Sequence, residues 1–265
     1  MKTTKHEAPV AWQELLKQAV NVPGRAAECY RAFHNYSFGN QLLVAWQCMA
    51  RGIELGPIAT FKKWKSLGRF VQKGQRALIL CVPVMKTIEE EGEKKQILCG
   101  FTYQKKWFTV SQTDGDDVEF EDVPGFDPEK AMAELKIEKV PFTMVNGNCQ
   151  GYATKGRKLA INPVAQHPLR TLLHEMAHIT LGHTSDGDVT DGEKLEYNLC
   201  ELEAEAVAYL LCDTFGLPGA EESRDYIQHW YKSNEVPEKQ AHRIFNAASK
   251  ILEAGKVEAT TTVAS

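Results

Sequence analysis

The apolar positions in the first quarter of the chain recur at helical spacing. Hydrophobic side chains every three or four residues predict one helix over residues 12–20 and a second over 42–49, which Gly52 would end. Thr60 is placed to cap a third, short helix over 60–67. These patterns predict amphipathic helices that each bury one face.

Runs of β-branched and aromatic residues replace this pattern further along. ALILCVPVM at 77–85 and QILCGFTYQ at 96–104 flank a turn rich in glutamate and glycine, and WFTV at 107–110 follows. We therefore expect the first half of the chain to combine helices with a small antiparallel sheet.

The second half begins with strand signals and ends in helices. A helix near 128–135 precedes two strand-like runs, PFTMVN at 141–146 and GYATKGRKLAIN at 151–162. Longer helical patterns follow over residues 170–181, 194–215, 221–232 and 238–254. Sheet first and helices afterwards predict an α+β fold class.

The composition is that of an ordinary globular protein. Of 265 residues, 43% are hydrophobic and 25% are charged, and no apolar run reaches the ~20 residues of a membrane span. Because the first nine residues lack the apolar core of a signal peptide, we expect a cytoplasmic protein without a membrane partner. Seven scattered cysteines, with no CxxC pair, argue against a disulfide framework or a cysteine-built zinc finger.

Charge is divided unevenly along the chain. Residues 1–113 contain 17 lysines and arginines against 8 aspartates and glutamates, whereas the remainder contains 14 against 27. The stretch DGDDVEFEDVPGFDPE that follows has eight acids, no base and two prolines, which is typical of a linker. We predict a basic domain over 1–113, an acidic linker over 114–127, a second domain over 128–256 and a flexible tail over 257–265.

His174, Glu175 and His178 form an HExxH motif inside one of the predicted helices. Positions i and i+4 of a helix lie one above the other, so both imidazoles can bind one divalent metal ion. Glu175 lies roughly a hundred degrees round the helix, where its carboxylate can act as general base and take the proton of a water nucleophile. Since neutral imidazole favours zinc, the motif predicts a zinc-type metallopeptidase site.

The third metal ligand has to come from another segment. HITLGH places Gly182 and His183 at the wrong offsets for the metzincin pattern HExxHxxGxxH. The next helix offers Glu201, Glu203 and Glu205; the first and last share a face, and Glu203 points away. Similarity to zincins with the patterns ExxAE or ExxxD favours Glu201 as ligand and Glu205 as support for a ligand histidine. The reversed assignment stays open.

The strand-like run at 151–162 lies just before the HExxH helix. Zincins keep at this point the edge strand along which a peptide substrate lies, so we expect a zincin-like domain that acts on a protein substrate. Two roles stay open for Tyr152, substrate contact or support of the fold. Two also stay open for His183, as a polar neighbour of the site or an ordinary helix-terminal residue.

Residues 55–88 contain no acid, and aromatic residues alternate with cations there. The aromatic residues are Phe61, Trp64 and Phe70, and the cations are Lys62, Lys63, Lys65, Arg69, Lys73 and Arg76. Single strands of nucleic acid are held by cations along the phosphates and by aromatic faces against the bases, so the region predicts single-strand binding. A solvated charged face, with Trp64 in the core, is the alternative interpretation.

Two parts of the chain are similar to ArdC-type antirestriction proteins. The segments at 36–47 and 61–84 resemble the N-terminal domain of that family, and HEMAH with ELEAEAVAYLLC resembles its C-terminal metallopeptidase domain. The resemblance implies a plasmid- or phage-borne protein that binds single-stranded DNA and protects incoming DNA from restriction, with a zinc-type or manganese-type metal site. The DNA-domain motif of the family falls on Asn40, Phe61, Trp64, Gly68, Val71, Lys73 and Gly74.

Three functions follow from these features. The first is an antirestriction protein in which DNA binding delivers a metallopeptidase to a protein target. The second is a non-catalytic protein that shields single-stranded DNA and uses the metal structurally. The third is a peptidase that cleaves a regulator, against which the lack of a helix-turn-helix pattern counts.

Overall fold

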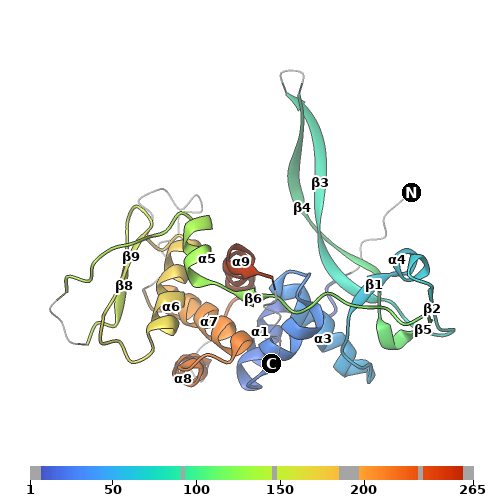
Figure 1. Cartoon of the computed structure of the whole chain (residues 1–265), viewed down its shortest axis with the longest axis horizontal. Helices are drawn as coiled ribbons and strands as arrows, with labels where there is room; N and C mark the ends of the chain where they lie inside the picture. Colours follow the sequence, from blue (N-terminus) through green and yellow to red (C-terminus); the bar gives the residue numbers. More distant parts are fainter. Residues whose placement is uncertain (1–6, 91–92, 145–147, 185–196, 232–234, 259–265) are drawn as a thin grey trace, which may run out of the picture. The chain divides into compact units, whose positions relative to one another are not determined.

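The computed structural model describes most of the chain and divides it into two units. The described residues are 7–90, 93–144, 148–184, 197–231 and 235–258. Unit 1 consists of residues 1–11 and 40–120, and unit 2 of residues 12–39 and 121–265. Each unit contains helices and small sheets (Figure 1), so the α+β prediction is confirmed.

The borders of the two units differ from the predicted domain borders at one place. The division near residue 120 falls inside the predicted linker, but residues 12–39 group with the C-terminal part of the chain. The reason is packing: α1 (Trp12–Asn21) lies against α9 (Glu238–Gly255), and α2 (Arg25–Phe33) lies against α7 (Tyr197–Phe215). Unit 1 therefore carries 14 lysines and arginines against 10 acids, and is less basic than residues 1–113.

Unit 1 is built from short elements around one three-stranded sheet. The sheet has the order β1-β4-β3 and is antiparallel, with Thr60 opposite Trp107 and Leu80 opposite Gln104. The elements are the greater part of α3 (Phe38–Arg51), β1 (Ile58–Thr60), α4 (Phe61–Ser66), β2 (Arg69–Val71), β3 (Leu78–Glu90), β4 (Glu93–Thr109), a 3-10 turn (Val110–Gln112) and β5 (Thr113–Gly115).

The β3–β4 ribbon is longer than the sequence predicted. The predicted strands at 77–85 and 96–104 extend to 13 and 17 residues, and together they project as a two-stranded arm from the rest of unit 1 (Figure 1). WFTV was expected to be a separate run, but residues 107–109 continue β4. Strand β5 pairs with β2, so the predicted linker begins with a strand.

Two amides of α3 cover the backbone of β3. The Nδ2 group of Asn40 donates to the carbonyl of Cys81 over 2.8 Å, and Cys81 N–H donates to Asn40 Oδ1 over 2.9 Å. Two turns later, Gln47 makes the same pair of hydrogen bonds with the backbone of Ile79. Because β3 is the outer strand here, these side chains satisfy backbone groups that would otherwise lack a ladder partner.

Unit 2 is mainly helical. Beside α1, α2, α7 and α9, it contains β6 (Gly125–Phe126), α5 (Pro128–Glu134), β7 (Glu138–Lys139), β8 (Gly151–Thr154), β9 (Lys158–Ile161), α6 (Pro168–Leu181), α8 (Ala220–Tyr231) and β10 (Lys256–Val257). Helix α2 was not predicted. The expectation of a strand at 141–146 is wrong for residues 141–144, which have no regular structure. Residues 145–146 of that predicted strand lie outside the described residues. So do residues 194–196 and 232, where one predicted helix begins and another ends.

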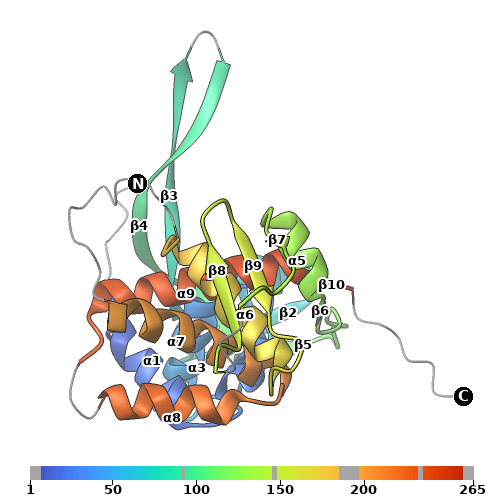
Figure 2. The same ribbon diagram turned by 90° about the vertical axis from the view of Figure 1, so that its left-hand side faces the viewer.

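Helix α7 forms the centre of the unit 2 core. It is packed by α2, α6, α8 and α9, and Leu202, Val207 and Leu211 are fully buried on it. A three-stranded sheet of order β7-β9-β8 packs on α6, as Figure 2 shows for the β8–β9 hairpin. Among the described residues, no helix is long and apolar enough to cross a membrane.

Candidate metal centre

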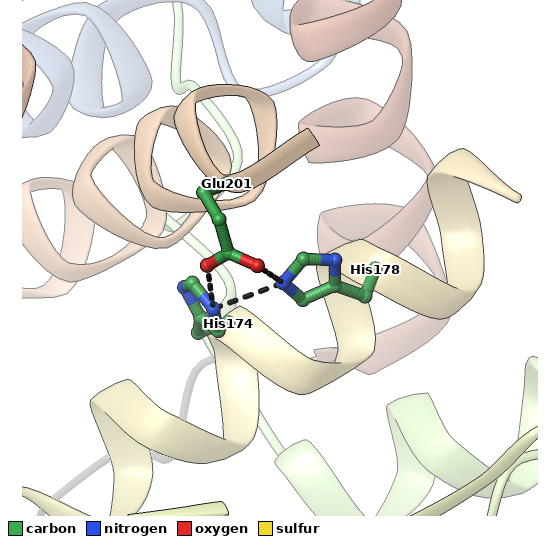
Figure 3. A group of neighbouring side chains, drawn as sticks. All are labelled: His174, His178 and Glu201. Atoms are coloured by element: carbon green, nitrogen blue, oxygen red, sulfur yellow. Dashed lines mark hydrogen bonds and ion pairs between the residues drawn. The ribbon is translucent and has the colours of Figure 1, made fainter. Parts of the chain in front are cut away.

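Helices α6 and α7 bring three potential metal ligands together. His174 and His178 project from one face of α6, with their Nε2 atoms 3.0 Å apart. The carboxylate of Glu201 on α7 spans both rings, with one oxygen 3.5 Å from His174 Nε2 and the other 3.5 Å from His178 Nε2 (Figure 3). Two imidazole nitrogens and a carboxylate thus converge on one point.

The amphipathic pattern of α6 explains why the two histidines face a pocket. Leu172, Leu173 and Met176 are buried and fix the orientation of the helix against its neighbours. The histidine face then opens on a pocket that also involves Glu201 and strand β8. The i, i+4 spacing puts His174 and His178 on one face of α6. The buried apolar residues of α7 orient that helix so that Glu201 lies beside them.

Glu205 occupies the far side of His174. Its Oε1 atom is 3.4 Å from His174 Nδ1, and both of its oxygens accept hydrogen bonds of 2.7 Å from Arg170. Ser223 of α8 donates a further hydrogen bond of 2.6 Å to Oε2. With its carboxylate engaged in this way, Glu205 is suited to support His174, and the geometry favours Glu201 as the ligand.

Glu203 faces away from Glu201, as predicted, and is fully buried. It accepts hydrogen bonds from Arg243 and is 2.8 Å from His183 Nε2, and His183 in turn contacts His178. His183 is therefore a polar neighbour of the site, which is one of the two roles left open for it.

Glu175 lies beside the three potential ligands and lines the same pocket. Its residue is 6% exposed, and burial raises the pKa of its carboxyl group. Gly151 of β8 is close by: a Cβ atom there would be 2.7 Å from Thr171 Cγ2 and 3.2 Å from Glu175 Oε1. Only glycine lets β8 approach α6 at this point, and the carboxylate fits against it.

The donor set fits a divalent metal ion. Two neutral imidazoles with one carboxylate are ligands that zinc and similar ions accept. Burial opposes ionisation of Glu201, but its contacts with His174 and His178 hold the pKa of its carboxyl group well below the usual range. The charged form that binds metal is therefore favoured.

Among the predicted DNA-binding residues, three are occupied with the fold of unit 1. Trp64 is 1% exposed and donates its Nε1 hydrogen to the carbonyl of Phe108 over 2.9 Å, so the prediction that it stacks on bases is wrong. Asn40 is held by β3, and Arg69 donates to Thr113 and to backbone carbonyls beside β5.

The remaining residues of that set lie on the surface. Phe61 and Phe70 are 53% and 58% exposed, which leaves their ring faces accessible. The cations Lys62, Lys63, Lys65, Lys73 and Arg76 are exposed as well, and none of them forms an ion pair with another residue that the structure describes. The aromatic and basic character of this surface therefore persists without Trp64.

Sequence reasoning missed several residues that surround the metal ligands. Arg170 lies one turn before His174 on α6, so the i, i+4 rule could have found it. Ser223 and Arg243 lie on α8 and α9, far away along the chain, and carry no local signal. Their role depends on tertiary packing.

Comparison with known proteins points to one family. Residues 5–123 match the family described as the N-terminal domain of anti-restriction factor ArdC. The chain is similar to the crystal structure of the antirestriction protein ArdC from plasmid R388 in its metal-free form, with 22% identity, a TM-score of 0.53 and coverage of 92% of this chain and 94% of the other. The Mn(II)-bound structure gives 21% identity, a TM-score of 0.52 and coverage of 92% and 97%. No curated protein sequence matches the chain significantly.

Proposed function

We propose that the chain, whose residues 5–123 match the family described as the N-terminal domain of anti-restriction factor ArdC, is an antirestriction protein of a plasmid or phage. In this proposal, unit 1 binds single-stranded DNA, and the centre on α6 and α7 hydrolyses peptide bonds in a protein of the host cytoplasm. The likeness to ArdC over nine-tenths of both chains supports the two-part organisation.

One observation carries the peptidase proposal: a buried carboxylate stands beside the two histidines and Glu201 in one pocket. His174, His178 and Glu201 would hold a divalent ion, which would supply Lewis-acid activation of a water nucleophile and of the scissile carbonyl. Glu175 takes the proton of that water on its carboxylate and can then pass it to the leaving amine. Burial raises the pKa of the Glu175 carboxyl group above its usual value, which makes the carboxylate a better proton acceptor.

The edge of strand β8 is the proposed binding site for the substrate backbone. Strand β8 is the outer strand of its sheet, and Gly151, Tyr152 and Ala153 line the pocket with Glu175. An extended peptide that pairs with this edge would bring one of its carbonyl groups toward the metal ligands. Main-chain pairing is tolerant of sequence, so selection of the target would come from elsewhere on the protein or from DNA.

The proposed DNA surface consists of Phe61, Phe70 and the exposed lysines and arginine that lie between these two residues or shortly after Phe70. Exposed aromatic rings stack on bases, and lysines follow the phosphates, so single strands are preferred over duplex and binding weakens with salt. Unit 1 as a whole has a small positive charge, so binding depends on this local surface rather than on net charge.

Zinc is our proposed ion on the grounds of its ligands, and manganese is the second choice. The antirestriction protein ArdC from plasmid R388 has been crystallised with Mn(II). The N, N, O donor set of the present chain accepts both ions. Metal content of the purified protein, measured by mass spectrometry, distinguishes them.

The experiment that tests the function compares wild type with Glu175→Gln. Each is expressed in a restricting host, which then receives unmodified DNA by conjugation, and host proteins are compared by mass spectrometry. We expect the wild type alone to produce cleaved fragments of a host protein and to protect the DNA, while both proteins bind metal and single-stranded DNA. Equal protection by Glu175→Gln without cleavage would instead favour the non-catalytic shield.

A further inference from the structure

The chain turns back on the metal-binding helix immediately after α6. Gly182 ends the helix with φ +83°, a conformation that favours glycine, and the N–H of His183 donates to the carbonyl of His178 over 2.9 Å. This turn brings the His183 ring beside the ring of His178, with their Nδ1 atoms 2.9 Å apart. The positions of Gly182 and His183, four and five residues after His178, thus have a geometric reason.

A buried chain of hydrogen bonds continues from His183 to a third helix. His183 Nε2 is 2.8 Å from Glu203 Oε2, and the side chains of the two residues are 5% and 0% exposed. Arg243 of α9 holds both oxygens of Glu203, with Nε donating over 2.8 Å and Nη2 over 3.1 Å. The same Nη2 group donates to the carbonyl of Leu181 over 3.0 Å, which ties α9 to the end of α6.

When His178 binds metal through Nε2, these hydrogen bonds allow only one assignment of protons to the ring nitrogens of His183 and His178. Glu203 forms an ion pair with Arg243 and is therefore a carboxylate, which only accepts hydrogen bonds, so His183 must donate to it from Nε2. The Nδ1 atom of His183 is then an acceptor, and His178 must donate to it from its own Nδ1. The lone pair of His178 is therefore left on Nε2, the atom that faces His174 and Glu201.

We propose that His183, Glu203 and Arg243 are positioning residues that fix the ring orientation and the tautomer of His178 for metal binding. The inference rests on the proposed metal site and deepens it. Partners of this kind typically contribute about 10–100-fold to metal affinity. The other ligand is held differently: Nδ1 of His174 has no hydrogen-bond partner among the described residues and only a 3.4 Å contact with Glu205.

The test uses the full chain with Glu203→Gln, which keeps the size of the side chain and replaces one acceptor by a donor. In the variant, an amide NH2 group at either oxygen position faces a donor of Arg243. Where it lies next to His183, it donates to His183 Nε2, which reverses the order of protons on the rings of His183 and His178. His178 would then carry its proton on Nε2 and lose its free lone pair there. The matched control is Glu221→Gln on the exposed start of α8, which removes the same charge away from the site.

Two measurements read out the result. Nitrogen-15 NMR of the imidazole rings in metal-free protein reports the tautomer of His178, and titration with Mn(II), followed by electron paramagnetic resonance of the free ion, reports affinity. We expect Nδ1–H in the wild type, a shift toward Nε2–H in Glu203→Gln, and Mn(II) affinity about 10–100-fold weaker in that variant. Glu221→Gln should match the wild type within about twofold.

Two outcomes would overturn the inference. One is an Nε2–H tautomer of His178 in the wild type, a measurement that needs no substitution and so does not depend on how well the variant folds. The other is Glu203→Gln binding Mn(II) as tightly as the control. If the wild type binds no Mn(II) while the tautomers behave as expected, the proposed metal site fails and the ordering of His178 by His183 stands.

Discussion

Trp64→Ala is the substitution whose effect separates a core residue from a DNA-binding one. The Trp64 ring is 1% exposed, lies edge-on to Phe120 with centroids 6.4 Å apart, and donates to the carbonyl of Phe108. Removing a buried tryptophan side chain costs about 3–5 kcal/mol of unfolding free energy. Trp64→Phe keeps most of the apolar volume but leaves the carbonyl without its donor, for which we expect about 1–2 kcal/mol.

Urea denaturation followed by circular dichroism measures these losses on the full chain. The matched surface control is Phe70→Ala, because Phe70 is 58% exposed and its truncation should change unfolding free energy by less than about 0.5 kcal/mol. A core position for Trp64 is ruled out if Trp64→Ala unfolds at the same urea concentration as the wild type but loses affinity for single-stranded DNA. That pair of results would place the ring on the DNA.

The other predictions concern both units. Phe61→Ala and Phe70→Ala should each weaken binding of a single-stranded oligonucleotide by about 1–3 kcal/mol in a fluorescence anisotropy titration; unchanged affinity in both would remove this surface from the DNA proposal. Asn40→Ala should lower unfolding free energy by about 1–3 kcal/mol, because it leaves the N–H and carbonyl of Cys81 without partners, and an unaltered urea midpoint would contradict that role. Gly151→Ala should abolish proteolysis while the protein stays folded, since its methyl group would displace Thr171 and Glu175; full activity would show that β8 can move aside.

Local patterns in the sequence were sufficient for much of the metal centre. Four-residue spacing puts His174 and His178 on one face of α6, and the same spacing separates Glu201 from Glu205 on α7. The resemblance to ArdC-type proteins was confirmed by the match over residues 5–123 and by the shared fold. What the sequence could not provide was the contact of Glu203 with Arg243, because nothing local relates α7 to α9.

The basic segment shows a different limit of sequence reasoning. Phe61, Trp64 and Phe70 alternate with cations in the same way, yet only Trp64 is buried, because α4 presents that one ring to β4 and to Phe120. Burial here depends on strands β1 and β4, which pair across about fifty residues of sequence.

Helix α2 was not predicted, although its sequence follows a helical pattern. Ala26, Cys29, Tyr30 and Phe33 follow helical spacing and are all buried, so the signal was present. Gly24, at φ +79°, precedes the helix and separates its apolar pattern from that of α1.

The central claim is that His174, His178 and Glu201 hold one divalent ion. A crystal of the full chain grown with Mn(II), with diffraction recorded at the manganese absorption edge, tests it directly. We expect one anomalous peak in contact with both Nε2 atoms and a carboxylate oxygen of Glu201. A peak ligated by Glu205 instead, or no peak between α6 and α7, would contradict it.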